Sequence, residues 1–272
     1  MPPPLSRRFM YPSSSTPCEN FIKRKEPEEI FTELHRDKFE LKPRTSYLKP
    51  NAIGTAKGSA YMEYGKTKLI ALVEPPREIH RSSKKSGVLG EVVCSLKYAP
   101  FSTSDSKNLE RRENLMSKAL KKALDPVICR NEFPSFELEI KVLVLDDDGC
   151  VLSTAINCCG IALIDGGIPT YDLITASTIS FYKDIEFVNP TAALEKLLNN
   201  NSIEDVEGEH GILVASSLAT LNQISMCYQK GFFSPEKLKL LNEHAIEINK
   251  HLLETVRYTL INKVKQHVKD AE

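Results

Sequence analysis

The sequence has no CxxC pair, no apolar run of 18 residues and no excess of either charge. Seven cysteines at irregular spacing fit reduced thiols in the cytosol or nucleus better than a framework of disulfides. Without a long apolar run, a membrane-spanning helix is not expected. The N-terminal stretch MPPPLSRRFM also lacks the apolar segment of a signal peptide, so we expect a protein that is neither secreted nor embedded in a membrane.

The charge balance excludes a protein that binds nucleic acid through a high overall positive charge. Lys and Arg together number 36, and Asp and Glu together also number 36. Any basic surface must therefore be local. The 272 residues, of which 41% are hydrophobic, suffice for one large domain or two small ones with a buried core.

The composition divides the chain near residue 40. Residues 1–40 hold several prolines, a run of serines and then a stretch of mixed charge. A segment of this composition buries little apolar surface, so we predict a tail that becomes ordered, if at all, on a partner. We predict that residues 41–272 form the folded domain.

The apolar pattern after Arg44 predicts a mixed α+β domain. Strand-like stretches either alternate in hydrophobicity or are continuously apolar, and helix-like stretches carry apolar residues with a period near 3.6. The last helix is expected to start at Pro235, with Ser234 as its N-cap. We expect a hairpin over 58–73 that turns at Gly65, further strands within 91–100, 136–145, 172–182 and 210–228, and helices over 109–124, 150–165 and 235–268.

Asp146, Asp147 and Asp148 follow a long apolar stretch and at first suggest a site for a divalent metal. A calcium loop that began at Asp146 would need Gly at its sixth position and Glu at its twelfth, but the sequence has Val151 and Asn157 there. We favour a solvated turn, in which Asp ends the strand and caps the next helix. The sequence therefore predicts neither a metal site nor a cofactor.

Other motifs of known chemistry are incomplete. Gly65-Lys66-Thr67 resembles the end of a phosphate-binding loop, but Ala60 stands where that motif needs glycine, and a strand rather than a helix follows. No serine lies in a G-x-S-x-G turn, and no cysteine lies in a recognisable catalytic context. Motifs alone predict no enzyme.

One loop, PPREIHRSSKKSG over residues 75–87, carries a local cluster of positive charge with Glu78 as its one acidic residue. A flexible loop of this kind can follow an RNA phosphate backbone, although many such loops are merely solvated. The candidates for RNA contact are Arg77, Arg81, Lys84 and Lys85.

The block IGTAKGSAYMEYGKTKLIALVEPPREIH resembles the opening hairpin of the ribonuclease PH family. Later blocks follow in the family's order, namely the helix around SKALKKAL, a long apolar strand, the stretch ALIDGGIPTYDLITAST and a strand-rich part with a last helix. The resemblance covers about residues 40–265 and implies mixed β-sheets packed with α-helices, an arrangement of the ribosomal protein S5 domain 2-like type. Within the family, the blocks are most similar to the catalytically silent eukaryotic exosome ring subunit of the mRNA-transport regulator type.

The resemblance also implies an active site that has lost its chemistry. Active members are phosphorolytic 3′-to-5′ exoribonucleases that hold phosphate with the Arg of a G-G-T-R-T-A block, and Ser153 stands at that position here. Acidic residues of two later blocks correspond to Asn189 and Gly211, and only Glu195 remains of a further acidic pair. A hydroxyl lacks the charged fork that binds an oxyanion, and without a carboxylate neither a metal nor a proton is held at the leaving group. We therefore predict that the chain is not an enzyme.

The same resemblance implies a set of partners. A silent ring subunit would pair with another ribonuclease PH-like subunit within a six-member ring, carry an S1/KH-type cap subunit and border a channel for single-stranded RNA. We expect it to support RNA processing and degradation, including rRNA maturation and mRNA decay, in the nucleus, nucleolus and cytoplasm. Two alternatives stay open: an active phosphorolytic exoribonuclease whose site uses Glu195 with the aspartates 146–148, and a free-standing RNA-binding protein.

Overall fold

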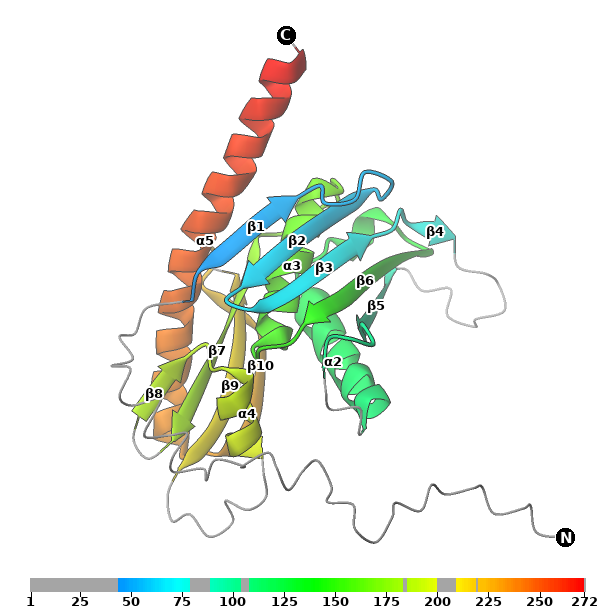
Figure 1. The fold of residues 1–272 in the computed structure, drawn as a ribbon. Coiled ribbons are helices and arrows are strands. Elements are labelled where there is room, and N and C mark those ends of the chain that lie inside the picture. Colours follow the sequence, from blue (N-terminus) through cyan, green and yellow to red (C-terminus); the bar gives the residue numbers. More distant parts are fainter. Residues whose placement is uncertain are drawn as a thin grey trace, which may run out of the picture. The chain divides into compact units, whose positions relative to one another are not determined.

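The computed structural model describes residues 44–78, 89–103, 108–182, 185–199, 209–218 and 220–271. Within these residues, two β-sheets and four α-helices form the fold (Figure 1). The α+β class predicted from the sequence is confirmed. The tail predicted over residues 1–40 lies outside the described residues and stays a prediction.

The first sheet has six strands. They are β1 (Ser46–Pro50), β2 (Gly58–Tyr64), β3 (Thr67–Val73), β4 (Arg77–Glu78), β5 (Glu91–Tyr98) and β6 (Phe136–Asp146). Their order is β1-β2-β3-β6-β4, and β5 pairs with β6 as well. All pairs are antiparallel except β5 with β6, which is parallel.

The hairpin predicted over 58–73 is confirmed as β2 and β3. Gly65 has a φ of 62°, a left-handed conformation that glycine adopts without a steric cost. Along β3 every second residue is buried, as expected for a strand with one face on the core. The hairpin thus fixes which side chains of the first sheet face inward.

Helix α3 (Val151–Asp165) lies between the two sheets, and each residue from Val151 to Leu163 is buried. It contacts β2 and β3 on one side and β7 (Ile174–Tyr182) on the other. Asn157 joins the helix to β7, since its side chain accepts a hydrogen bond from the Ala176 N–H (2.7 Å) and donates one to the Ala176 carbonyl (2.9 Å). The buried helix predicted over 150–165 is therefore confirmed.

The second sheet has four antiparallel strands in the order β10-β9-β7-β8. Besides β7, they are β8 (Ile185–Val188), β9 (His210–Leu218) and β10 (Gln223–Phe232). The long helix α5 (Pro235–Ala271) packs against β7 and β9. The hydroxyl of Ser234 accepts a hydrogen bond from the Lys237 N–H (3.3 Å), which confirms the predicted N-cap.

Three further helical segments complete the description. Helix α2 (Leu109–Leu124) spans the residues predicted for it, packs beside β5 and buries Leu120, Ala123 and Leu124. A 3-10 turn (Arg130–Glu132) leads into β6, and α4 (Ala192–Asn199) precedes β9. None of the described helices carries an apolar stretch long enough to cross a membrane.

The sequence did not predict β1, β8 or α4, and it placed the two residues of β4 in a loop. Strands β1 and β8 are short, and β1 ends at Pro50, so neither shows the alternation of a longer strand. Helix α4 has only eight residues, too few to establish a helical period. Their positions depend on the neighbours against which they pack, and a local pattern does not contain that information.

The close approach of β2 to α3 yields a stability prediction. A Cβ added at Gly58 would lie 2.3 Å from the Ala162 carbonyl oxygen and 2.5 Å from the Gly166 nitrogen. Because backbone atoms cannot move away cheaply, we expect Gly58→Ala to lower the free energy of unfolding by about 2 kcal/mol or more. Gly54→Ala is the control, since no atom lies within 4 Å of its added Cβ. Urea denaturation measures both variants, and equal losses would contradict the packing described for α3.

Candidate functional site

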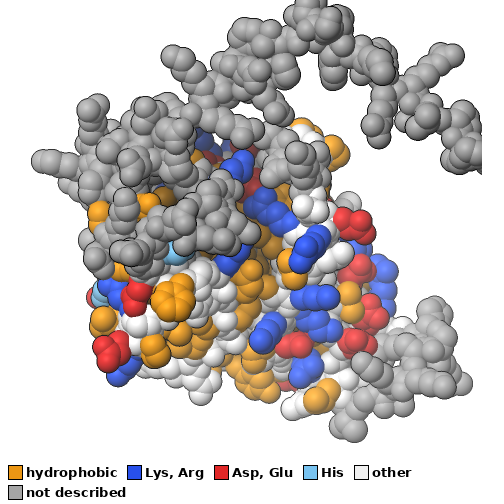
Figure 2. All heavy atoms as spheres, turned by 90° about the horizontal axis from the view of Figure 1, so that it is seen from below, with side chains coloured by type: hydrophobic (Ala, Val, Ile, Leu, Met, Phe, Trp, Pro, Cys, Tyr) orange, Lys and Arg blue, Asp and Glu red, His pale blue; other side chains and the backbone are white. Residues whose placement is uncertain are grey.

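A cavity of about 570 Å³ opens where α2, the start of α3, α4, β9 and β10 meet. Its apolar lining includes Leu115, Met116, Val151, Leu152, Ile212 and Val214. Its charged lining consists of the cations Arg111, Arg112, Lys196 and Lys230 and the acids Asp147 and Glu195. The face seen in Figure 2 likewise has Lys and Arg side chains directly beside hydrophobic ones.

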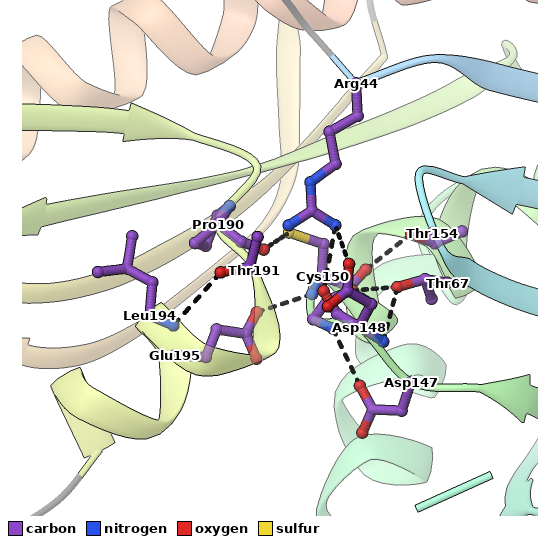
Figure 3. Close-up of polar contacts among 11 residues, drawn as sticks. Arg44, Thr67, Asp147, Asp148, Cys150, Thr154, Pro190, Thr191, Leu194 and Glu195 are labelled. Carbon is purple, nitrogen blue, oxygen red and sulfur yellow. Dashed lines mark hydrogen bonds and ion pairs between the residues drawn. The ribbon is translucent and has the colours of Figure 1, made fainter. Parts of the chain in front are cut away.

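The turn from β6 into α3 forms one wall of this site (Figure 3). The Thr67 hydroxyl donates a hydrogen bond to the Gly149 carbonyl (2.7 Å) and accepts one from the Asp148 N–H (3.1 Å). The Gly149 N–H in turn donates to the Asp147 carboxylate (3.1 Å). These bonds hold the hairpin and the turn together, although 82 residues separate Thr67 from Gly149.

The three aspartates of this turn have different environments. Asp146 is exposed, as predicted for a solvated turn. Asp148 lies 3.6 Å from the Arg44 guanidinium, and Arg44 also donates to the Asp148 carbonyl (3.1 Å). The Asp147 side chain is only 6% exposed and pairs with Arg112 at 2.9 Å. The solvated-turn interpretation is therefore wrong for Asp147, whose side chain is buried. Arg112 compensates the carboxylate charge that burial would otherwise penalise.

Arg112 is held in place from two directions. Its guanidinium pairs with Asp147 and lies 5.0 Å from the centre of the Tyr98 ring, a cation–π contact. The sequence predicted the helix that carries this arginine but gave the arginine no role. Its partner lies 35 residues away, so no local pattern indicated the pair.

Glu195 places a carboxylate at the N-terminus of α3. Its Oε1 accepts a hydrogen bond of 2.7 Å from the Cys150 N–H, immediately before the helix begins (Figure 3). A helix N-terminus attracts anions, because its first N–H groups are unpaired and the helix dipole is positive there. Burial nevertheless raises the pKa of Glu195, outweighing this hydrogen bond and the nearby charges of Arg112 and Arg44. The protein's own carboxylate thus fills the position that an anionic ligand of α3 would take.

Cys150, next to Glu195, is not a nucleophile. Its thiol donates a hydrogen bond to the Pro190 carbonyl (3.1 Å), and burial raises its pKa well above the ordinary value. A buried thiol that stays protonated does not attack a substrate at neutral pH.

Ser153, Asn189 and Gly211 do not line the cavity. The Ser153 hydroxyl donates to the Cys150 carbonyl (3.1 Å) and accepts from the Thr178 hydroxyl (2.8 Å). Buried Asn189 accepts a hydrogen bond from the Thr178 N–H (3.3 Å) and donates one to the Tyr64 hydroxyl. Ser153 thus joins α3 to the second sheet, and Asn189 joins the second sheet to β2 of the first.

Gly211 stands opposite Gly231 in the β9–β10 pair. A Cβ at position 211 would lie 2.4 Å from the Lys230 carbonyl oxygen, so no side chain fits there without moving β10. The immediate neighbours of the two predicted positions, Leu152 in α3 and Ile212 in β9, do line the cavity, together with Val151 and Val214.

Of the four candidates for RNA contact, the structure describes only Arg77. It is exposed in β4 and pairs with Glu74 at 3.0 Å, which partly neutralises its charge. Arg81, Lys84 and Lys85 lie outside the described residues, so their role stays a prediction. The structure does not bring Arg77 to the cavity.

Comparison with known proteins places the chain in a family. Residues 42–169 match the model of domain 1 of the 3′ exoribonuclease family, RNase PH. The exosome component Rrp41 of Pyrococcus horikoshii is 30% identical over 244 residues, which cover 87% of this chain and 92% of that protein. The chain belongs to the RNase PH family. The family resemblance predicted from the sequence is confirmed.

Other relatives of this RNase PH-family chain are also exosome components. MTR3 of Mus musculus is 29% identical over 235 residues, which cover 80% of both chains. Rrp46 of rice (Oryza sativa) superimposes with a TM-score of 0.63 at 21% identity, covering 81% of this chain and 96% of that one. A chain of the Archaeoglobus fulgidus exosome, solved with RNA bound to the active site, superimposes with a TM-score of 0.67 at 15% identity, covering 84% and 96%. These two structures confirm the predicted fold.

The contact between Glu195 and Cys150 yields a paired prediction. Glu195→Gln keeps an acceptor for the Cys150 N–H and removes a buried charge, so at pH 7 we expect it to be at least as stable as the wild type. Glu195→Ala leaves the N–H without this partner, and we expect a loss of about 1–3 kcal/mol. Chemical denaturation of both variants measures the difference.

The pH dependence provides a control. Because the folded-state pKa of Glu195 is raised above 4.5, the charged carboxylate costs stability above that pKa, and the cost disappears as the pH falls through it. Glutamine has no such dependence, so the wild type should gain stability relative to Glu195→Gln between pH 7 and 4.5. A constant difference between the two proteins would contradict this account of Glu195.

Proposed function

We propose that the chain is a non-catalytic structural subunit of the RNA exosome core ring. It would support 3′-to-5′ RNA processing and degradation by other subunits, including rRNA maturation and mRNA decay. The observation that carries the proposal is the uncharged lining at the start of α3 and along β9. The relatives that are exosome components support the ring role.

Phosphorolysis needs a positive group at the start of α3. In active members, the resemblance puts the phosphate-holding Arg in the block that begins this helix. The residues of the block that line the cavity are Cys150, Val151 and Leu152, none of which is charged. Glu195 adds a carboxylate at the same helix terminus, and its negative charge repels phosphate. Neither Ser153 nor its neighbour Leu152 carries a positive charge, so this helix start has no group in place of the Arg.

The same reasoning applies to the catalytic carboxylate. The residues of β9 that line the cavity are Ile212 and Val214, and Gly211 has no room for a side chain. An aliphatic side chain neither holds a metal nor takes a proton at the leaving group. The two elements that would supply the chemistry thus present only apolar groups to the cavity.

The outer edge of β10 supports a role in assembly. This strand stands at the end of the second sheet, and its Ile224 and Phe232 side chains are 46% and 70% exposed. A long edge strand with apolar side chains is a site where another chain adds a strand. We propose that a second RNase PH-like subunit pairs here within a six-member ring that also carries S1/KH-type cap subunits. Single-stranded RNA would pass through this ring in the nucleus, nucleolus and cytoplasm.

One observation favours the alternative of an active phosphorolytic exoribonuclease. Asp147 and Glu195 line the same cavity as Arg111 and Lys230, so acids and cations do meet. Asp147, however, is paired with Arg112, and Glu195 is bonded to the α3 backbone, so both acids already have partners. The non-catalytic role is therefore the better-supported function.

A phosphorolysis assay distinguishes the non-catalytic role from the alternative of an active exoribonuclease. We expect the purified chain, alone or with its RNase PH-like partner, to contribute no release of nucleoside diphosphates from single-stranded RNA and inorganic phosphate. Replacing the three aspartates 146–148 by Asn should leave the turnover of the assembled ring unchanged wherever the ring still forms. Activity of the chain alone that this triple variant abolishes would establish the alternative instead.

A second test addresses assembly. We expect the double variant Ile224→Lys/Phe232→Lys to weaken pairing with a co-expressed RNase PH-like subunit by about tenfold or more, because two apolar contacts are lost and charge is placed on the edge. Light scattering on the co-purified complex measures the pairing. Phe101→Lys is the control, since Phe101 is 77% exposed and lies outside both sheets. If the double variant pairs with the partner subunit as well as the wild type does, β10 is not the edge through which the subunits pair.

A further inference from the structure

The last turns of α5 extend past the sheet on which the helix packs (Figure 1). The helix has 37 residues, about 55 Å at about 1.5 Å per residue. Strand β7, which it crosses, has nine residues, about 30 Å. Among the described side chains, Val256 is the last buried one of α5, and the last ion pair to the body joins Lys263 to Asp165 at the end of α3. The side chains described from Val264 to Lys269 are all exposed.

This end of the helix is apolar on one side. Tyr258, Ile261, Val264 and Val268 are 69%, 53%, 62% and 54% exposed. Their spacings of three, three and four residues put them on one side of an α-helix. A solvated helix end needs no such stripe, and a stripe of this spacing is the pattern by which a helix packs against another helix.

Positive charge accompanies the stripe. Arg257 and Lys265 lie on the same side of the helix as the apolar residues, Lys269 lies at the edge of the stripe, and all three are exposed. The sequence from Arg257 to Ala271 has one acidic residue, Asp270. Arg257 donates a hydrogen bond to the Thr220 hydroxyl (2.7 Å), which holds the start of the stripe against the body. Lys265 and Lys269, one helical turn apart, remain available to a partner's carboxylates.

We propose that the exposed end of α5, residues 258–269, docks an amphipathic helix of a partner protein that carries Asp or Glu beside its apolar face. Charge complementarity selects this occupant. A second copy of the chain would bring its own lysines against these, and like charges across a helix pair oppose association. RNA would need a contact made mainly of cations, but Tyr258, Ile261, Val264 and Val268 make this one mainly apolar. The surface is separate from the β10 edge and does not depend on the proposed function.

Two matched designed peptides, each able to form an amphipathic helix, test the proposal. The probe is a labelled amphipathic peptide about three heptads long, with Leu at the core positions and Glu at the flanking ones; its match carries Lys in place of Glu. We expect the full chain, alone or with its ring partner, to bind the Glu peptide at least tenfold more tightly than the Lys peptide, as measured by fluorescence anisotropy. Equal affinity for the two peptides, or no binding, overturns the proposal.

Variants locate the contact. Ile261→Ser/Val264→Ser should weaken binding of the Glu peptide about tenfold or more, whereas Lys265→Glu/Lys269→Glu should reverse the preference in favour of the Lys peptide. Leu240→Ser is the control, because Leu240 is 48% exposed near the other end of α5. All positions are exposed, and circular dichroism checks that each variant is folded.

Two further results count against the proposal. Self-association of the full chain in light scattering, lost in Ile261→Ser/Val264→Ser, would assign the stripe to a second copy. Binding of single-stranded RNA that Lys265→Glu/Lys269→Glu removes, without any peptide binding, would assign it to RNA.

Discussion

The burial of α3 on all sides is the constraint on which the rest of the structure depends. A helix between two sheets leaves no room for large side chains where the layers come closest, and the chain places Gly58, Gly160 and Gly166 there. The sheets can then contact the helix backbone directly, which aligns β2 on one side with β7 on the other. Because interiors are densely packed, this alignment fixes where the first turn of α3 emerges.

That first turn decides the chemistry of the cavity. Since α3 cannot rotate, only Cys150, Val151 and Leu152 reach the cavity, while Ser153 faces the second sheet. Glu195, which belongs to α4, accepts a hydrogen bond from the Cys150 N–H at the N-terminus of α3. Both acids of the cavity already have partners, since Asp147 pairs with Arg112 and Glu195 accepts a hydrogen bond from the backbone.

Sequence reasoning predicted the elements whose pattern is local. Helix α2 was placed at its bounds, 109–124, because its apolar period is regular over four turns. The site was harder, because its contacts join distant residues: Arg112 meets Asp147, and Glu195 meets Cys150 across 45 residues. The direction in which each side chain points was hardest to predict. A shift of one residue rotates a helical side chain by about 100° and moves a strand side chain to the other face of the sheet. Ser153 and Gly211 are each one residue from a position that lines the cavity.

The two hydrogen bonds between Asn157 and Ala176 bear on how the chain can be divided. The match to the family model ends at residue 169, before β7 begins. A fragment cut there would leave the Asn157 amide without either partner and would expose the apolar side of α3 that β7 covers. The end of the family match is therefore not a boundary in the packing, because α3 and its Asn157 amide serve the second sheet as well as the first.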